Sequence, residues 1–275
     1  MKKILLKTER LSKSFSSGGV LQHVLKNIDL ELYEGDFTVI MGASGAGKST
    51  LLYALSGMDT PTLGDITFGN TLISRLNQDE LAVFRRNHCG FVFQQIYLID
   101  GMSVMDNVLS AGLLVSQRPH SSRRADVQRH PLGPLLRGNK DKKALLSRAR
   151  ELFAAVGLSE ETRKKFPTQI SGGEAQRAGI VRALINNQDI LFADEPTGAL
   201  NSKTGLDVLD TLTRFNGQGQ SVVMVTHDMR SARRGNRILY LKDGAILGEC
   251  SLGGYVHGDT ARHRKLSAFL TEMGW

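Results

Sequence analysis

Apolar positions early in the chain first alternate with polar ones and then run together. The alternation extends from Ile28 to Leu32, and beyond Gly35 a mostly apolar run extends from Phe37 to Met41. Alternation is typical of a strand with one buried face, and a continuous apolar run is typical of a strand buried on both faces. We therefore predict a half-buried strand followed by a buried one.

Three further segments follow this pair. The stretch GASGAGKSTLLYALSG reads as a glycine loop and then a helix that Gly57 ends, because glycine readily adopts the left-handed conformation after a helix. GDITFGN is typical of part of a short hairpin. NQDELAVFRRN predicts a helix whose N-cap is Asn77.

The second half of the chain alternates helices with short strands. Helical spacing from Leu145 to Val156 ends at Gly157, and another helix starts near Ser171. The apolar runs DILFAD and SVVMVTH flank a helix that carries Leu206, Leu209, Leu212 and Phe215. Strands that alternate with helices imply an α/β fold with a parallel sheet. Residues 95–180 have almost no strand signal, so we expect a separate helical subdomain there.

Composition narrows the class of protein. The 275 residues are 41% hydrophobic and 23% charged, as expected for a globular chain. No segment approaches the roughly 18 consecutive apolar residues of a membrane span, and the apolar run in MKKILLKTER is too short for a signal peptide. Cys89 and Cys250 are isolated, which favours packing over a metal site and fits a cytoplasmic location.

The formal charge of +8 is concentrated in one segment. Residues 117–142 contain seven basic residues, two acidic residues and three of the six prolines. Without sustained periodicity, this composition predicts an exposed or disordered insertion. A contact with anionic lipid or with a partner is the alternative.

The glycine loop has the spacing of a phosphate-binding loop, because Gly42, Gly47, Lys48 and Ser49 satisfy G-x-x-x-x-G-K-[ST]. Backbone N–H groups from about Gly45 to Thr50 could surround a phosphate at the start of the helix. Lys48 would reach the β- and γ-phosphates of ATP, and Ser49 would bind Mg²⁺. The expected nucleotide-binding set in this loop is Gly42, Ser44, Gly45, Ala46, Gly47, Lys48, Ser49 and Thr50.

Four polar residues follow other predicted strands. We expect Asp194 to bind Mg²⁺ and Glu195 to act as the general base for a water molecule. His227 would contact the γ-phosphate, and Gln94 would bind the metal or the attacking water. Taken singly, acidic pairs and histidines after strands are common at ordinary surfaces.

With these residues in order, the sequence resembles the nucleotide-binding subunits of ATP-binding cassette (ABC) transporters over nearly its whole length. The phosphate loop, ISGGE, LFADE and THD carry the resemblance. It implies a P-loop NTPase ABC cassette with a mostly parallel sheet core, an antiparallel β subdomain and a helical subdomain. The expected division is a core of residues 1–94 and 181–250, a helical subdomain of 95–180, and a tail helix in 251–275.

The resemblance also implies a head-to-tail dimer. Ser171, Gly172, Gly173 and Glu174 of the signature loop would meet the nucleotide held by the phosphate loop of a second copy. Phe15 would stack on adenine, and GALN, residues 198–201, would cross the interface. This chain departs from the family at two positions, with Glu174 in place of glutamine and Asn201 in place of aspartate.

The leading hypothesis is an ATP-hydrolysing subunit that powers a separate membrane permease, bound at the cytoplasmic side of the membrane. Within the family, the sequence looks most like the group for macrolide export, lipoprotein release and bacitracin-type peptide resistance, and peptide export is the preferred substrate hypothesis. An ABC ATPase acting on nucleic acid is the alternative. A regulatory module with weakened turnover, suggested by Glu174 and Asn201, is the third possibility.

Overall fold

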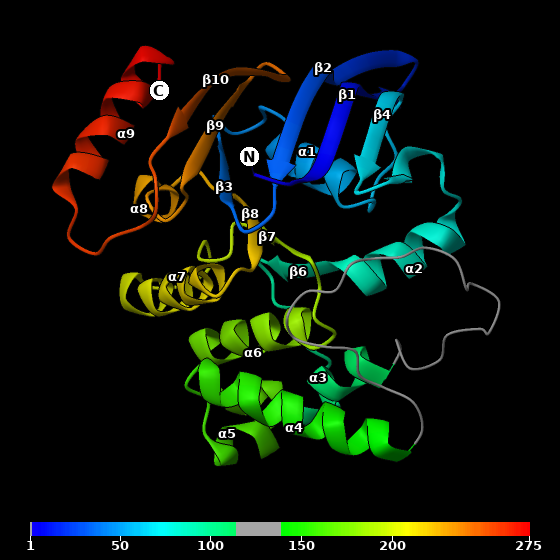
Figure 1. Cartoon of the computed structure of the whole chain (residues 1–275), viewed down its shortest axis with the longest axis vertical. Helices are drawn as coiled ribbons and strands as arrows, with labels where there is room; N and C mark the ends of the chain where they lie inside the picture. The colour runs from blue at the N-terminus through cyan, green and yellow to red at the C-terminus, as the bar shows by residue number, and fades with distance from the viewer. Residues whose placement is uncertain (1, 114–138) are drawn as a thin grey trace.

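The computed structural model describes residues 2–113 and 139–275, and its centre is a six-stranded sheet (Figure 1). The strand order is β10-β9-β3-β8-β7-β6. Neighbours from β9 to β6 are parallel, whereas β10 is antiparallel to β9. The strands are β3 (Phe37–Met41), β6 (Cys89–Phe93), β7 (Ile190–Asp194), β8 (Ser221–Val225), β9 (Arg237–Lys242) and β10 (Ala245–Ser251). The predicted mostly parallel core is confirmed.

A second, four-stranded sheet is antiparallel and has the order β2-β1-β4-β5. Its strands are β1 (Ile4–Ser17), β2 (Val20–Tyr33), β4 (Leu63–Phe68) and β5 (Thr71–Leu72). Ile28, Leu30 and Leu32 of β2 are buried, as their alternation predicts. The antiparallel β subdomain is confirmed, and GDITFGN forms most of β4 and the turn before β5, as part of the predicted short hairpin.

The helices are α1 (Lys48–Leu55), α2 (Gln78–His88), α3 (Val104–Leu113), α4 (Asn139–Ala155), α5 (Glu160–Lys164), α6 (Gly172–Leu184), α7 (Ser202–Gly217), α8 (Met229–Ala232) and α9 (Thr260–Glu272), with short 3₁₀ helices at Ile73–Arg75 and Pro167–Gln169. The side chain of Asn77 accepts a hydrogen bond from the backbone N–H of Glu80, so the predicted cap of α2 is present. Gly57 follows α1 with a φ of 69°, and Gly157 follows α4 with a φ of 68°. Both left-handed helix ends favour glycine.

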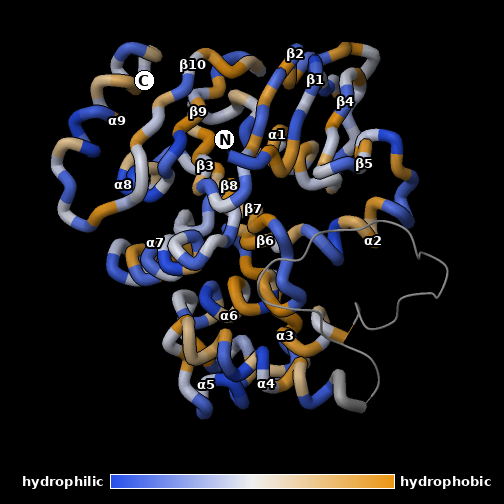
Figure 2. Tube along the Cα trace, viewed as in Figure 1, coloured by the Kyte–Doolittle hydropathy of each residue, from blue (hydrophilic) through white to orange (hydrophobic). Residues whose placement is uncertain are grey.

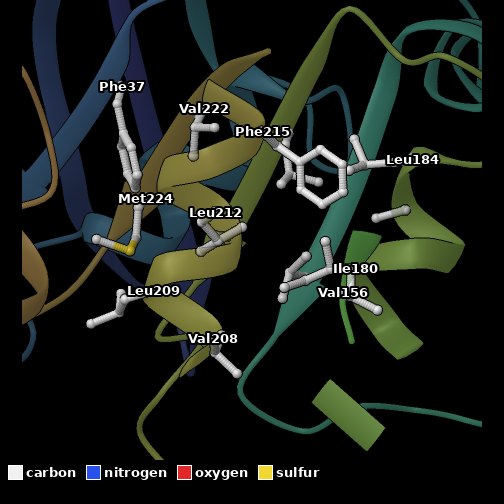
Figure 3. Packing of buried hydrophobic residues seen from close by; sticks show 14 of the residues in the cluster. Phe37, Val156, Ile180, Leu184, Val208, Leu209, Leu212, Phe215, Val222 and Met224 are labelled. Carbon is white, nitrogen blue, oxygen red and sulfur yellow. The ribbon is translucent and has the colours of Figure 1, made fainter. Parts of the chain in front are cut away.

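One hydrophobic core lies between the parallel sheet and the helices. Figure 3 shows α7 directing Leu209 and Leu212 toward Phe37 and Met224 of the sheet, while Phe215 lies beside Leu184 of α6. Figure 2 shows the accompanying concentration of apolar residues where β6, β7 and β8 meet. This packing fixes α6 relative to the strand ends, which matters for the site.

A second core fills the space between the two sheets. Apolar residues of β1, β2 and β4 pack with α1 against the opposite face of the parallel sheet. Leu51, Leu52 and Leu55 of α1 are fully buried there. Helix α1 is therefore enclosed by both sheets, and the loop before it is rigidly placed.

The helices from α3 to α6 gather at the end of the molecule opposite β1 and β2 (Figure 1). The expected boundary at residue 180 falls inside α6, which continues to Leu184. Most of the basic segment 117–142 lies outside the described residues, but residues 139–142 belong to the first turn of α4 rather than to a loop. None of the helices in the described parts of the chain is long and apolar enough to cross a membrane.

The last helix, α9, is attached to the rest of the fold by Arg262, which is only 3% exposed. Its guanidinium donates hydrogen bonds to the backbone carbonyls of Arg233, Gly235, Leu252, Gly253 and Gly254. Leu266 and Leu270 of the same helix are buried in the core beside the sheet. The tail is thus an integral part of this fold.

Candidate nucleotide-binding site

The carboxyl ends of four neighbouring parallel strands meet at one edge of the sheet. Across the ladder, Phe93 of β6 is paired with Asp194 of β7, Asp194 with Val225 of β8, and Val225 with Ile40 of β3. The residues that follow these partners therefore emerge side by side. In open α/β sheets this edge is where ligands bind.

The glycines of the loop after β3 meet physical requirements of the backbone. A Cβ atom on Gly42 would lie 2.2 Å from the carbonyl oxygen of Leu241, so no other residue fits there. Gly47 has a φ of 98° and is the N-cap of α1. A Cβ atom on Gly47 would also lie 3.0 Å from the carbonyl oxygen of Val24. The predicted curled loop therefore requires glycine at both of these positions.

Lys48 folds back over this loop. Its Nζ donates hydrogen bonds of 2.9 Å to the carbonyl oxygens of Gly42 and Ala43. Burial lowers the pKa of the Lys48 ammonium, while the carboxylates of Glu195 and Asp194 act in the opposite direction. A half-buried ammonium close to a helix N-terminus offers positive potential to an anion such as a phosphate.

Asp194 lies at the end of β7 and is held at both carboxylate oxygens. Ser49 Oγ donates to Oδ1 at 3.0 Å, and the Tyr53 hydroxyl donates to Oδ2 at 2.8 Å. Burial, followed by the hydrogen bond to Asp194, raises the pKa of Tyr53 to about 12. The structure thus brings together Ser49 and Asp194, two of the three residues predicted to bind Mg²⁺, and adds a tyrosine that the sequence motifs do not include.

These donors suit Mg²⁺. In the described residues, no group of three or more His, Cys, Asp or Glu side chains could hold a metal by itself. Mg²⁺ prefers hard oxygen ligands and usually takes only one or two from the protein, with the remainder from substrate phosphates and water. The hydroxyl of Ser49 and the carboxylate of Asp194 supply two such oxygens beside the phosphate loop.

Glu195 and His227 form a hydrogen-bonded pair. The distance from Glu195 Oε1 to His227 Nδ1 is 2.8 Å. The side chain of Glu195 is 18% exposed and that of His227 is 68% exposed, so the pair lies at the rim of the sheet edge. Glu195 has a φ of 46°, which is unusual for a residue other than glycine and directs the chain away from the strand. The hydrogen bond to His227 fixes the orientation of the Glu195 carboxylate at this edge of the sheet, beside the phosphate loop.

Gln94 follows β6 and is exposed. It packs over the loop 198–201, because a Cβ atom on Gly198 would lie 2.9 Å from Gln94 Nε2. The structure places Gln94 one residue beyond the register partner of Asp194. Gln94 is therefore at the same edge as the other candidates, in contact with the predicted interface loop.

The signature loop begins α6. Ser171 is the N-cap, and its Oγ accepts a hydrogen bond from the backbone N–H of Glu174. Gly173 is buried, and a Cβ atom there would lie 3.0 Å from Thr204. In turn, the Asn201 side chain accepts a hydrogen bond from the Thr204 N–H, so this departure from the family keeps a helix cap. The signature loop and the interface loop therefore pack against each other within one chain.

Phe15 lies in β1 and is 44% exposed, so it is not part of the hydrophobic core. Lys13 Nζ lies 5.0 Å from the centre of its ring. The adjacent strand, β2, touches the phosphate loop through Val24, which approaches the Cβ position of Gly47. Phe15 is paired with Gln22, two residues before Val24 in β2, and its exposed ring is suitable for stacking on a base.

The signature loop and the phosphate loop occupy different parts of the chain. Figure 1 shows α1 beside the antiparallel sheet and α6 among the helices beyond β6 and β7. In the described part of the chain, no hydrogen bond or ion pair joins Ser171 to Lys48. The structure brings the phosphate-loop residues together with Asp194, Glu195 and His227, and it leaves Ser171, Gly172, Gly173 and Glu174 apart.

A profile of the ABC transporter family matches residues 25–198, which include both loops and Asp194 with Glu195. The chain belongs to the ABC transporter family. It is an ATPase cassette of the P-loop NTPase class, with the fold that the sequence predicts. The nucleic-acid alternative receives no support from these comparisons.

Curated relatives of this ABC cassette include proteins of about its own length and proteins about three times as long. It is 39% identical over 252 residues to the uncharacterized ABC transporter ATP-binding protein MJ0796 of Methanocaldococcus jannaschii, covering 91% of the chain and 99% of that relative. It is 37% identical over 250 residues to the macrolide export ATP-binding/permease protein MacB of Wolinella succinogenes, covering 90% of the chain but 34% of MacB. The chain thus spans about a third of the MacB relatives it matches.

Solved structures agree with this membership. The cassette aligns to the dimeric, post-hydrolysis structure of MJ0796 bound to ADP and Pi with a TM-score of 0.76 and 37% identity, covering 91% of the chain and all of the other. A second dimeric structure of MJ0796 gives a TM-score of 0.75. The ABC cassette fold is therefore shared at high coverage.

Two residues of the cassette that sequence reasoning missed connect the signature helix to the sheet edge. Gln176 Nε2 donates to the carbonyl oxygen of Phe93 at 2.9 Å, immediately before Gln94. Arg182 donates to the carbonyls of Ile96 and Tyr97, just after it. Both lie on α6, about one and three turns after its start. Polar residues within a largely buried helix were the sequence signal that could have identified these contacts. The Gln94 segment is thus attached to the signature helix.

Proposed function

We propose that two copies of this chain pack head to tail and hydrolyse ATP at their shared interface. Each copy supplies the phosphate loop of one site and the signature loop of the other. The separation of Ser171 from Lys48 within one chain supports this proposal, because each loop has the chemistry of an anion site and neither completes the other. The dimeric structures solved for MJ0796 support it further.

In the proposed reaction, Lys48 and the backbone N–H groups after Gly45 bind the phosphates, and Phe15 stacks on adenine. Ser49 and Asp194 would hold Mg²⁺, which would supply positive charge to offset that of the phosphates. Glu195 takes a proton from water as the water oxygen attacks the γ-phosphorus, and the bond to the bridging oxygen of ADP breaks. His227 keeps the Glu195 carboxylate oriented through their 2.8 Å hydrogen bond.

The energy of this reaction is proposed to drive a membrane permease, with the cassette bound at the cytoplasmic face. The MacB relatives carry a permease in the same chain, and MJ0796 is a cassette with little more than the length matched here. Gln94 and the exposed Tyr97 and Ile99 that follow it are the proposed permease contact. We further propose an amphiphilic cargo, with antimicrobial peptides as the preferred class.

The decisive experiment is the substitution Glu195→Gln. It keeps the shape of the side chain and removes the base, so turnover should fall by about 10² to 10⁴. The variant cannot cleave ATP, so it should form a lasting dimer when ATP is present, which light scattering should detect. The wild type should form this dimer only transiently. Ser171→Ala in the same background should lose that dimer.

The matched control is Glu160→Gln, which neutralises an exposed glutamate of α5 whose side chain is 71% exposed. It should change neither turnover nor assembly. A wild-type chain that hydrolyses ATP at full rate as a strict monomer would contradict the proposal. So would an unchanged dimer after Ser171→Ala. The cargo is tested separately, by stimulation of turnover with cationic amphiphilic peptides in membranes containing the permease.

A further inference from the structure

Tyr53 lies on α1 one turn after Ser49, and both side chains reach the end of β7. Residues four apart lie on the same face of a helix, so the phosphate loop and the tyrosine are presented together. Ser49 Oγ donates to one oxygen of Asp194 at 3.0 Å, and the Tyr53 hydroxyl donates to the other at 2.8 Å. The carboxylate is therefore held from two sides by a single helix.

Ser49 and Tyr53 differ in what they contribute to the site. In the proposed function, the Ser49 oxygen is a ligand of Mg²⁺, whereas the Tyr53 hydroxyl is bonded to the Asp194 oxygen on the side away from Ser49. An ionised carboxylate only accepts hydrogen bonds, and an O–H···O⁻ bond is among the stronger ones in proteins. A carboxylate fixed at Oδ2 cannot rotate freely about its Cβ–Cγ bond, so the oxygen beside Ser49 stays on the metal side.

The surroundings of Tyr53 restrict its own movement. Its backbone carbonyl accepts hydrogen bonds from the N–H groups of Met58 and Asp59 and from Ser56 Oγ, which fixes the end of α1. The ring is partly buried. The hydroxyl is thus delivered to Asp194 from a helix enclosed between two sheets, rather than from a loop.

We propose that Tyr53 is a positioning residue for the magnesium nucleotide, because its hydroxyl orients the Asp194 carboxylate toward the metal. This inference rests on the proposed function of Ser49 and Asp194. It predicts that removing the hydroxyl weakens nucleotide binding only when Mg²⁺ is present. A tyrosine that merely supported the fold would alter binding with and without the metal alike.

The test is Tyr53→Phe, which deletes one oxygen atom and keeps the ring. ATP dissociation constants are measured by titration calorimetry in MgCl₂ and in EDTA, in the Glu195→Gln background so that ATP is not consumed. We expect the gain in affinity that Mg²⁺ gives to fall by about tenfold, as expected for one lost hydrogen bond to a charged group. The affinity in EDTA should stay within about twofold of the parent.

The chain contains a closely matched control. The Tyr33 hydroxyl also donates to a carboxylate at 2.8 Å, that of Glu31, on the antiparallel sheet away from the phosphate loop. Tyr33→Phe should leave both dissociation constants unchanged. Thermal unfolding of all variants, with and without nucleotide, shows whether each is folded at the temperature of the titrations.

Each outcome has one meaning. A reduced effect of Mg²⁺ in Tyr53→Phe alone supports the inference. An equal loss in MgCl₂ and EDTA, or the same loss in Tyr33→Phe, overturns it. If the parent itself binds ATP no better with Mg²⁺ than with EDTA, the proposed function of Ser49 and Asp194 fails, and that result is distinguishable because it does not depend on Tyr53.

Discussion

Glu174 Oε2 accepts two hydrogen bonds of 2.9 Å from Ser171, one from its backbone N–H and one from its hydroxyl. The other carboxylate oxygen accepts a 3.2 Å hydrogen bond from Thr162. The chain therefore places its own anion on donors that, in the proposed dimer, face the γ-phosphate of a second copy. Glutamine, which the family usually has at this position, could accept the two hydrogen bonds from Ser171 at its amide oxygen without the charge, whereas its NH₂ group could not accept the one from Thr162.

The substitution Glu174→Gln is expected to strengthen ATP-driven dimerisation. Hydrogen bonds to a charged acceptor are roughly twice as strong as neutral ones, so the amide should release the Ser171 hydroxyl more readily. We expect the dimer of the Glu195→Gln variant to form at about five- to tenfold lower protein concentration. Light scattering in saturating ATP measures this, and Glu160→Gln is again the control. A weaker or unchanged dimer would contradict the interpretation.

The Glu174 carboxylate should make the stability of the protein depend on pH. The hydrogen bond from the Ser171 backbone lowers the pKa of Glu174 below its ordinary value of 4.5. A lowered pKa in the folded state adds stability that is present above the unfolded value and is lost as pH falls through the folded value. Urea unfolding should therefore show a constant difference between wild type and Glu174→Gln above about pH 5.5, decreasing below about pH 4.5. A difference that persists undiminished at low pH would refute this assignment.

His227→Ala should reduce turnover and spare nucleotide binding. The imidazole is bonded to Glu195 and is largely exposed, so its loss affects the orientation of the carboxylate more than the fold. We expect turnover to fall by about tenfold or more, and the free energy of unfolding to change by less than about 0.5 kcal/mol. His257→Ala, at another exposed histidine, should change neither quantity. Weaker ATP binding with normal turnover of bound ATP would show that His227 acts differently.

Gln176→Leu should destabilise the cassette. Gln176 is 1% exposed, and its amide satisfies the carbonyl oxygen of Phe93. A buried carbonyl left without a partner costs about 1 to 3 kcal/mol, which urea unfolding resolves. Gln78→Leu, on the exposed face of α2, should cost far less. Equal stability of the two variants would mean that the Phe93 carbonyl finds another partner.

Sequence patterns located four of the five parallel strands, β3, β6, β7 and β8, and most helices, because these strands are short apolar runs buried in the core. The pairing of β1 with β2 was not predicted from the pattern. The register of this long hairpin shifts at four places, and the alternation of apolar residues breaks with each shift. The β9–β10 hairpin also went unpredicted, although its signal was present. Asp243 and Gly244 form its turn with φ values of 50° and 82°, the left-handed pair that Asp-Gly favours.

Some residues of the candidate site could be predicted from the sequence, and others could not. Local motifs identify the glycine loop, Lys48 and the acidic pair, because their chemistry depends on neighbours in the sequence. The contacts of Tyr53 with Asp194 and of Gln176 with Phe93 join residues separated by 141 and 83 positions. Such pairings depend on the order of strands in the sheet, which no local pattern contains.

The order of the sheet also governs when a newly made polypeptide can hold nucleotide. β8 lies between β3 and β7, so the lysine-bearing loop and its acidic counterpart acquire their spacing only after residues 221–225 have joined them. A ribosome-bound fragment that stops short of this strand has both halves of the pocket at undefined separation. We therefore expect nucleotide affinity to be absent from nascent chains that lack this strand and to appear once it has been inserted between its neighbours.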